Sequence, residues 1–197
     1  MRKIPTLFRR IFQKGQVVGI SHDVTPGMEW VLNGEGYATV KMDGAACAII
    51  NGKFYKRYDA KKGKTPPAGA IPCCPPDPVT GHHPHWIPVN FSHPADKWFV
   101  AAFRNTFKNS SRPADGTYEA IGYHFRDNPY HMKDDMLEPH GVRIIRDLPR
   151  TYDGIRTYLR DHYIEGIVFY KDDQPMCKIK RTDFGFVWNK KEVQPHD

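Results

Sequence analysis

The sequence has few cysteines and no long apolar run, and both absences argue against whole classes of protein. Its 197 residues include four cysteines, and two of them, Cys73 and Cys74, are adjacent, which is not the pattern of a disulfide-stapled secreted domain. No apolar stretch approaches the length that crosses a bilayer, and the basic N-terminal segment lacks the apolar middle of a secretory signal. We therefore expect a protein of the reducing cytoplasm, without a membrane partner.

Acidic residues are outnumbered by basic ones. The chain has 29 Lys and Arg against 22 Asp and Glu, a formal net charge of +7. An excess of positive charge favours an anionic partner, most commonly nucleic acid or a nucleotide phosphate. With 40% hydrophobic and 13% aromatic residues the chain is expected to fold, and its length fits one domain over residues 1–197.

The local patterns predict an α+β protein built on antiparallel sheets. Residues 15–59 indicate short strands separated by Pro-Gly, Asp-Gly and Asn-Gly turns, and residues 116–125 indicate a strand with Glu119 on one face. Residues 151–163 predict a helix with Thr151 as its N-cap. That helix leads into the strand IEGIVFY, a KDDQP turn and the strand MCKIKRTDFGFVW, an antiparallel hairpin.

Residues 62–90 are rich in proline, glycine and histidine, and we expect a loop there. Prolines recur between residues 66 and 78, which disfavours a helix or a central strand. Long loops in compact domains are often functional, so this one could border an active site. A zinc site is the alternative, although adjacent cysteines are poor spacing for structural zinc. Its candidate ligands are Cys73, Cys74, His82, His83 and His85.

Lys41 lies between the apolar segments Ala-Thr-Val and Ala-Ala-Cys-Ala-Ile-Ile. In one interpretation its stem lies on apolar surface and its charge reaches water. In the other, burial and cationic neighbours favour the neutral amine, which is a nucleophile.

The tripeptide KIK at residues 178–180 gives a second clue. Period-2 alternation predicts that Lys178 and Lys180 lie on one side of a strand and Ile179 on the other. Two ammonium groups on one face need an anion between them, and a phosphate would satisfy both. Glu165, on the neighbouring strand, could complete a metal site or balance one of the lysines.

Five short motifs in order resemble those of the covalent nucleotidyltransferases. These are KxDG at residues 41–44, a following Arg57, the strand Glu119, EGIV at residues 165–168 and KIK at residues 178–180. The group includes ATP-dependent DNA ligases and mRNA-capping enzymes. The segments PPDPVTGHHPHWIPV and KRTDFG resemble small single-domain RNA ligases more closely. The similarity spans residues 25–188, most of the chain.

The resemblance implies a nucleotidyltransferase (adenylation) domain whose antiparallel sheets flank a nucleotide cleft. It implies an ATP-dependent RNA ligase that joins 5′-phosphate and 3′-hydroxyl ends through a lysyl-AMP intermediate. In this reading Lys41 is the nucleophile, and Mg²⁺ or Mn²⁺ is bound with the help of Glu165. The other implied nucleotide contacts are Asp43, Arg57, Glu119 on the ribose, Val168 against adenine, and Lys178 and Lys180 on the α-phosphate.

The sequence departs from the ligase pattern in two places, and these bear on which other functions stay open. Val40 stands where some RNA ligases carry a carboxylate that reads the adenine, so base recognition must come from elsewhere. The sequence ends shortly after the last motif, so we expect no C-terminal OB domain, which weakens the alternatives of a DNA nick ligase or a capping-type guanylyltransferase. Asp43 could be a simple turn residue. The alternative without enzymatic activity is a zinc-stabilised RNA-binding module.

Overall fold

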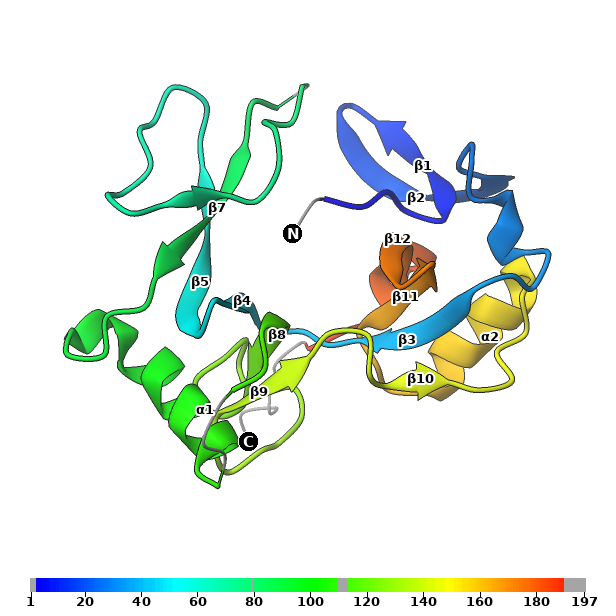
Figure 1. Cartoon of the computed structure of the whole chain (residues 1–197). Coiled ribbons are helices and arrows are strands. Elements are labelled where there is room, and N and C mark those ends of the chain that lie inside the picture. Colours follow the sequence, from blue (N-terminus) through cyan, green and yellow to red (C-terminus); the bar gives the residue numbers. More distant parts are fainter. Residues whose placement is uncertain (1–2, 79, 110–112, 190–197) are drawn as a thin grey trace, which may run out of the picture. The chain divides into compact units, whose positions relative to one another are not determined.

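The computed structural model describes residues 3–78, 80–109 and 113–189. The chain divides into two compact units: unit 1 is Met1–Lys3 with Asp43–His140, and unit 2 is Ile4–Met42 with Gly141–Asp197. Each unit combines antiparallel sheet with one α-helix (Figure 1). The α+β class expected from the sequence is confirmed at this level, and the single domain over residues 1–197 stays a prediction.

Unit 1 is built on a six-stranded antiparallel sheet in the order β6-β7-β5-β4-β8-β9. Helix α1 packs against β8 and β9 and buries Val100 and Ala102 in a core shared with Cys47 and Ile49. The elements are β4 (Ala45–Ile50), β5 (Lys53–Ala60), β6 (Ile71–Pro72), β7 (His83–Pro88), η2 (Pro94–Asp96), α1 (Lys97–Phe107), β8 (Gly116–Ile121) and β9 (Met136–Pro139).

The expected loop over residues 62–90 contains two strands. β7 pairs with β5 from Tyr55↔Pro88 to Ala60↔His83, so this part of the loop is regular structure. Proline is tolerated there because β6 pairs with β7 only at Trp86 and His85, which leaves most of β7 close to a sheet edge. Helix α1 has no counterpart among the elements expected from the sequence, and β8 ends at Ile121 rather than at residue 125.

Unit 2 contains a four-stranded antiparallel sheet in the order β10-β3-β11-β12 and a separate two-stranded hairpin. The hairpin appears in blue in Figure 1. The elements are β1 (Phe8–Gln13), β2 (Gln16–Val24), η1 (Glu29–Val31), β3 (Tyr37–Lys41), β10 (Ile144–Ile145), α2 (Tyr152–Asp161), β11 (Gly166–Lys171), β12 (Gln174–Lys180) and η3 (Arg181–Phe184).

Helix α2 begins as the sequence predicts. The Thr151 side chain accepts a hydrogen bond from the Gly154 N–H, an N-cap that satisfies one orphan donor of the first turn. Ile155 and Leu159 are fully buried and lie on one face because they are four residues apart. The predicted β11–β12 hairpin is also present, but its second strand is shorter than expected. The sequence predicted a strand through residue 188, whereas β12 ends at Lys180 and the 3-10 helix η3 follows, in which the Asp183 side chain accepts from the Lys180 N–H.

The two faces of the four-stranded sheet differ in character. Ile167, Phe169 and Ile179 are fully buried in the core that α2 covers. Residues between them along the strands project to the opposite face because side chains alternate. That face carries Val168 and the two lysines of the KIK segment. The described residues contain no helix that is both long and apolar enough to cross a membrane.

Candidate functional site

One row of residues crosses three strands of unit 2 at the end of the sheet. Gly166 on β11 pairs with Lys41 on β3 and with Lys180 on β12. A Cβ on Gly166 would lie 2.3 Å from the Ile179 carbonyl oxygen, so only glycine fits between the strands here. The register therefore places Lys41 and Lys180 on the two neighbours of a strand position that has no side chain.

Glu165 connects the two lysines. Its Oε2 lies 2.5 Å from Lys41 Nζ, and its Oε1 lies 2.7 Å from Lys180 Nζ. The residue is only 4% exposed, and the two ammonium groups offset the loss of hydration of its buried carboxyl group. Of the two roles expected for Glu165, the charge balance is therefore observed, and it involves two lysines.

Lys178 is the third cation of this group. It pairs with Val168 across the β11–β12 ladder, two residues from the Gly166↔Lys180 pair, so both lysines of KIK lie on the same face, as predicted. Burial, followed by the charges of Lys41 and Lys180, lowers the pKa of Lys178 to about 8. We call Lys41, Lys178, Lys180 and Glu165 the lysine cluster.

The lysine cluster has more cationic charge than its carboxylate can balance. Within residues 3–78, 80–109 and 113–189, the Lys178 ammonium group has no hydrogen-bond or ion-pair partner. The charge of Arg10 also contributes to the lowered pKa of Lys178. A face with three lysines and one carboxylate is suited to bind an anion with several oxygens, such as a phosphate.

Arg10 and Asp183 belong to the same neighbourhood, and no role was expected for either residue from the sequence. Arg10 Nη2 lies 3.4 Å from Asp183 Oδ1, and Asp183 Oδ2 accepts a hydrogen bond from the Lys180 N–H at 2.8 Å. Arg10 is 173 residues from Asp183 in the chain, so no local pattern could have predicted their pairing.

Val168 is next to the cluster on the same sheet face. It is paired with Thr39 on one side and Lys178 on the other, and it is partly buried. An aliphatic side chain beside a cationic cluster is compatible with the expected contact to a base. That contact stays a prediction.

The Lys-Met-Asp-Gly segment passes from unit 2 into unit 1 between Met42 and Asp43. In unit 1 the Asp43 N–H donates to the Tyr130 hydroxyl at 2.5 Å, and Asp43 Oδ1 lies 3.9 Å from Arg126 Nε. A Cβ on Gly44 would lie 2.1 Å from the Ala120 carbonyl oxygen. The glycine of this motif is thus needed for close packing of β4 on β8, and Asp43 pairs within unit 1.

Glu119 lies on β8 of unit 1, 9% exposed, and is held by a histidine. His140 Nε2 lies 2.9 Å from Glu119 Oε2, while His140 Nδ1 is the one buried side-chain nitrogen or oxygen without a hydrogen-bond partner in the described residues. An unpaired ring nitrogen is tolerated best without a proton, because an N–H donor would lose its hydrogen bonds to water. His140 therefore donates through Nε2 and fixes one oxygen of Glu119.

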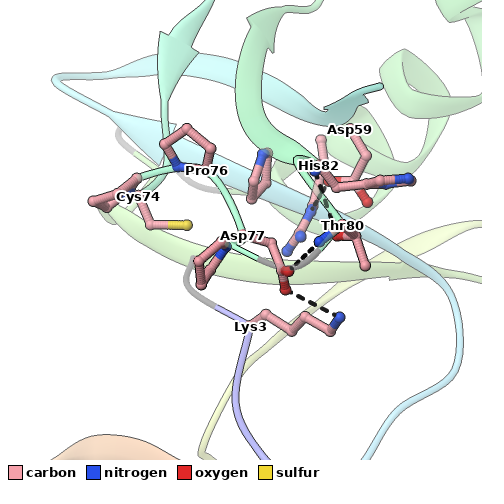
Figure 2. A pocket seen from close by; sticks show the side chains of 11 residues that line it. Lys3, Asp59, Cys74, Pro76, Asp77, Thr80 and His82 are labelled. Carbon is pink, nitrogen blue, oxygen red and sulfur yellow. Dashed lines mark hydrogen bonds and ion pairs between the residues drawn. The ribbon is translucent and has the colours of Figure 1, made fainter. Parts of the chain in front are cut away.

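Arg57 lies on β5 and lines a pocket of about 520 Å³ in unit 1. Its Nε lies 3.0 Å from Asp59 Oδ1. Figure 2 shows Lys3 directed toward Asp77, and their charged groups are 3.4 Å apart. The pocket is lined mainly by the proline-rich segment: Cys74, Pro75, Pro76, Asp77, Pro78, Thr80, His82 and Pro84, with Lys3, Arg57 and Asp59.

Asp77 organises the proline-rich turn that borders this pocket. Its Oδ1 accepts a hydrogen bond from the Thr80 N–H at 2.9 Å (Figure 2), and its carbonyl oxygen accepts one from the Gly81 N–H at 2.8 Å. Its own N–H donates to the His82 carbonyl oxygen. These hydrogen bonds tie Asp77 to Thr80, Gly81 and His82, with the aspartate side chain accepting from a backbone N–H as is common in turns.

The metal expectations concern two places. Across the described ranges no three His, Cys, Asp or Glu side chains are grouped so as to hold a metal ion, and His85, one expected zinc ligand, is buried with Nδ1 2.7 Å from the His83 carbonyl oxygen. Mg²⁺ is commonly held by one or two carboxylates together with substrate phosphates. The lysine cluster contributes the carboxylate of Glu165, whose two oxygens pair with Lys41 and Lys180, so Mg²⁺ binding at this place stays a prediction.

Comparison with known proteins adds no family assignment: no protein-family model matches the chain, and no curated protein matches it.

Proposed function

We propose that the chain is an ATP-dependent RNA ligase of the covalent nucleotidyltransferase type. The observation that carries the proposal is the lysine cluster, in which Lys41 and Lys180 share the carboxylate of Glu165 and Lys178 adds a third ammonium group on the same face of the sheet. Nucleotidyl transfer depends mainly on positioning and on stabilising negative charge, and this cluster supplies both a nucleophile and cations.

In the first step Lys41 Nζ attacks the α-phosphorus of ATP. A P–N bond forms, the bond from the α-phosphorus to the bridging oxygen breaks, and pyrophosphate leaves with that electron pair. Because Glu165 Oε2 lies 2.5 Å from Lys41 Nζ, the carboxylate is placed to accept the ammonium proton before the attack. Lys178 and Lys180 stabilise the charge that develops on the α-phosphate oxygens.

In the second step a 5′-phosphate oxygen of RNA attacks the same phosphorus and the P–N bond breaks, which returns Lys41 as an amine. In the third step the 3′-hydroxyl oxygen of the other strand attacks the RNA 5′-phosphorus and forms the phosphodiester bond. The bond from that phosphorus to the oxygen that bridges to AMP breaks, AMP leaves with the electron pair, and the hydroxyl proton is released. When bound, Mg²⁺ would neutralise phosphate charge, with Glu165 as its protein ligand. The nucleotide contacts expected for Asp43, Arg57 and Glu119 of unit 1 remain predictions within this proposal.

The test is incubation with each of the four α-labelled nucleoside triphosphates, followed by a denaturing gel. We expect covalent label from ATP and none from γ-labelled ATP, since the outer phosphates leave. Release of the label by acid and by 5′-phosphorylated RNA, but not by 5′-hydroxyl RNA, supports ligation. Label from GTP in place of ATP would replace the ligase with the capping-type alternative.

A further inference from the structure

The hairpin of β1 and β2 has an anchored base and an exposed far end. An isolated two-stranded hairpin is only marginally stable, so the anchor matters. Thr6 forms a parallel bridge with Lys178, the Leu7 N–H donates to the Lys178 carbonyl oxygen, and the Lys178 N–H donates to that of Pro5. The chain enters β1 two residues after this bridge. The hairpin therefore starts directly beside the strand that carries two residues of the lysine cluster.

A second contact to this part of unit 2 is made by Arg10, which lies within β1 of the hairpin. It reaches Asp183, the carboxylate that also accepts the Lys180 N–H, and Asp183 is buried. Ile20, the residue opposite Arg10 in the hairpin, is buried in the core of unit 2. The Arg10 end of the hairpin is thus held within unit 2, close to the cationic site.

Beyond Arg10 the hairpin exposes large apolar side chains. Phe12 is 64% exposed and its cross-strand partner Val17 is 45% exposed. Ile11 and Val18 beside them are exposed as well, so four large apolar residues gather within eight positions. Single exposed apolar residues are ordinary, but a gathered set marks an interaction surface.

The charges of the hairpin restrict what this surface binds. Arg9 and Lys14 are exposed on either side of Phe12 in the sequence, and the one acidic residue of the two strands is Asp23, at the anchored end, where it accepts a hydrogen bond from Ser21 Oγ. An excess of cations toward the far end favours a polyanion, and an exposed aromatic ring there favours a polyanion with rings of its own to stack. In a duplex the base faces are already stacked, whereas single-stranded RNA leaves them accessible.

We infer that the β1–β2 hairpin binds the single-stranded RNA that presents its 5′-phosphate to the lysine cluster. Phe12 stacks on an unpaired base, and Arg9 and Lys14 contact backbone phosphates. The inference rests on the proposed function for the identity of the strand, and the hairpin supplies affinity for RNA without a part in the attack on ATP.

The first test measures binding of a short, 5′-phosphorylated, 3′-labelled single-stranded RNA by fluorescence anisotropy. Phe12→Ala is expected to weaken binding about tenfold, the size of one lost stacking contact, and Phe12→Trp is expected to retain it. Unchanged affinity in Phe12→Ala, or tighter binding of a blunt RNA duplex than of the single strand by the wild-type chain, would overturn the stacking role.

The second test separates phosphate contacts from general charge. The double variant Arg9→Ala/Lys14→Ala is expected to lower the slope of log affinity against log salt by about 0.7 per lost contact. Lys53→Ala/Arg104→Ala removes the same charge from exposed positions of unit 1 and is expected to leave the slope unchanged. Equal slopes in the two double variants would remove the hairpin from the RNA interface.

Self-labelling with α-labelled ATP distinguishes this inference from the proposed function. The Phe12 and Arg9/Lys14 variants are expected to label as the wild type does while losing RNA affinity. A wild-type chain that binds RNA through the hairpin but never labels would leave the inference intact and end the ligase proposal. A wild-type chain that sediments as a dimer, with a monomeric Phe12→Ala variant, would make the hairpin a self-association surface and overturn the inference.

Discussion

The candidate residues of the two units differ in how their charges are balanced. In unit 2, Lys41 and Lys180 share one carboxylate, and the Lys178 ammonium group has no partner among the described residues. In unit 1, Arg57 pairs with Asp59, and Glu119 is held by His140. A group with more cations than carboxylates favours binding of an anion, whereas charged side chains that already have a partner are held in place by it. Under the proposed function, the lysine cluster is therefore expected to carry the chemistry, and the unit 1 residues are expected to position the nucleotide.

The largest effect is expected from removing a cation of the lysine cluster. Lys178→Ala and Lys180→Ala should each lower the single-turnover rate of self-labelling by about 10²–10³, because each lysine stabilises charge on the transferring phosphate. Lys53→Ala, a matched loss of charge at an exposed position of unit 1, should label normally. Wild-type rates in either cluster variant would remove the phosphate-binding assignment.

The next largest effect is expected from replacing the carboxylate of Glu165. Glu165→Gln keeps the shape of the side chain but leaves Lys41 and Lys180 without a negative partner. We expect self-labelling to fall about 10²-fold and its dependence on Mg²⁺ concentration to shift, while the Kd for ATP changes by much less. A metal titration that superimposes on that of the wild type would contradict the metal role of Glu165.

A smaller effect is expected from breaking the contact between His140 and Glu119 in unit 1. His140→Ala frees the Glu119 carboxylate, and kcat/KM for ATP should fall about tenfold, comparable to one hydrogen bond to a charged group. If Glu119 contacts the ribose, His140→Ala should lower kcat/KM for 2′-deoxy-ATP less than it lowers kcat/KM for ATP. The ratio of the two kcat/KM values should therefore be smaller in the variant than in the wild type. A variant that loses stability but keeps the wild-type ratio of ATP to 2′-deoxy-ATP would show that the pair is structural only.

The smallest effect concerns the free energy of unfolding, and here removing the charge of Lys178 is expected to be favourable. The pKa of Lys178 falls from its ordinary value of 10.5 to about 8, so between these pH values the folded chain binds fewer protons than the unfolded chain. The free energy of unfolding should rise with pH across this window, and at pH 7 the buried charge is unfavourable.

Lys178→Met should therefore stabilise the chain at pH 7, by on the order of 1–3 kcal/mol. The advantage should shrink as the pH rises from about 8 toward 10.5, where the wild-type lysine loses its proton in both states. Urea unfolding of both chains at the two ends of this window measures the change. A Lys178→Met variant that is less stable at pH 7 would show that the ammonium group is well solvated.

The sequence predicted what depends on neighbours along the chain. Helix α2 with its Thr151 cap and the β11–β12 hairpin follow from local periodicity and turn residues, and the hairpin register brings Glu165 next to Lys180. The shared face of Lys178 and Lys180 follows from strand alternation. Each of these successes concerns contacts within one helix or one hairpin.

What the sequence could not predict depends on contacts between distant segments. Arg10 meets Asp183 because the N-terminal segment lies along β12, and nothing near Arg10 in the sequence encodes this. His140 reaches Glu119 from the end of the neighbouring strand β9. Strand β7 was missed because its prolines argued against it, and they are tolerated where β6 covers only two of its residues.

The central claim is that Lys41, and not the neighbouring Lys178 with its lowered pKa, is the residue that becomes attached to AMP. The direct measurement is labelling with ATP, digestion under non-acidic conditions, and mass-spectrometric assignment of the modified lysine, with Lys41→Arg and Lys178→Arg in parallel. The account predicts AMP on Lys41 in the wild-type chain and none in Lys41→Arg, because arginine cannot supply a neutral amine. AMP on Lys178, or label retained by Lys41→Arg, would contradict it.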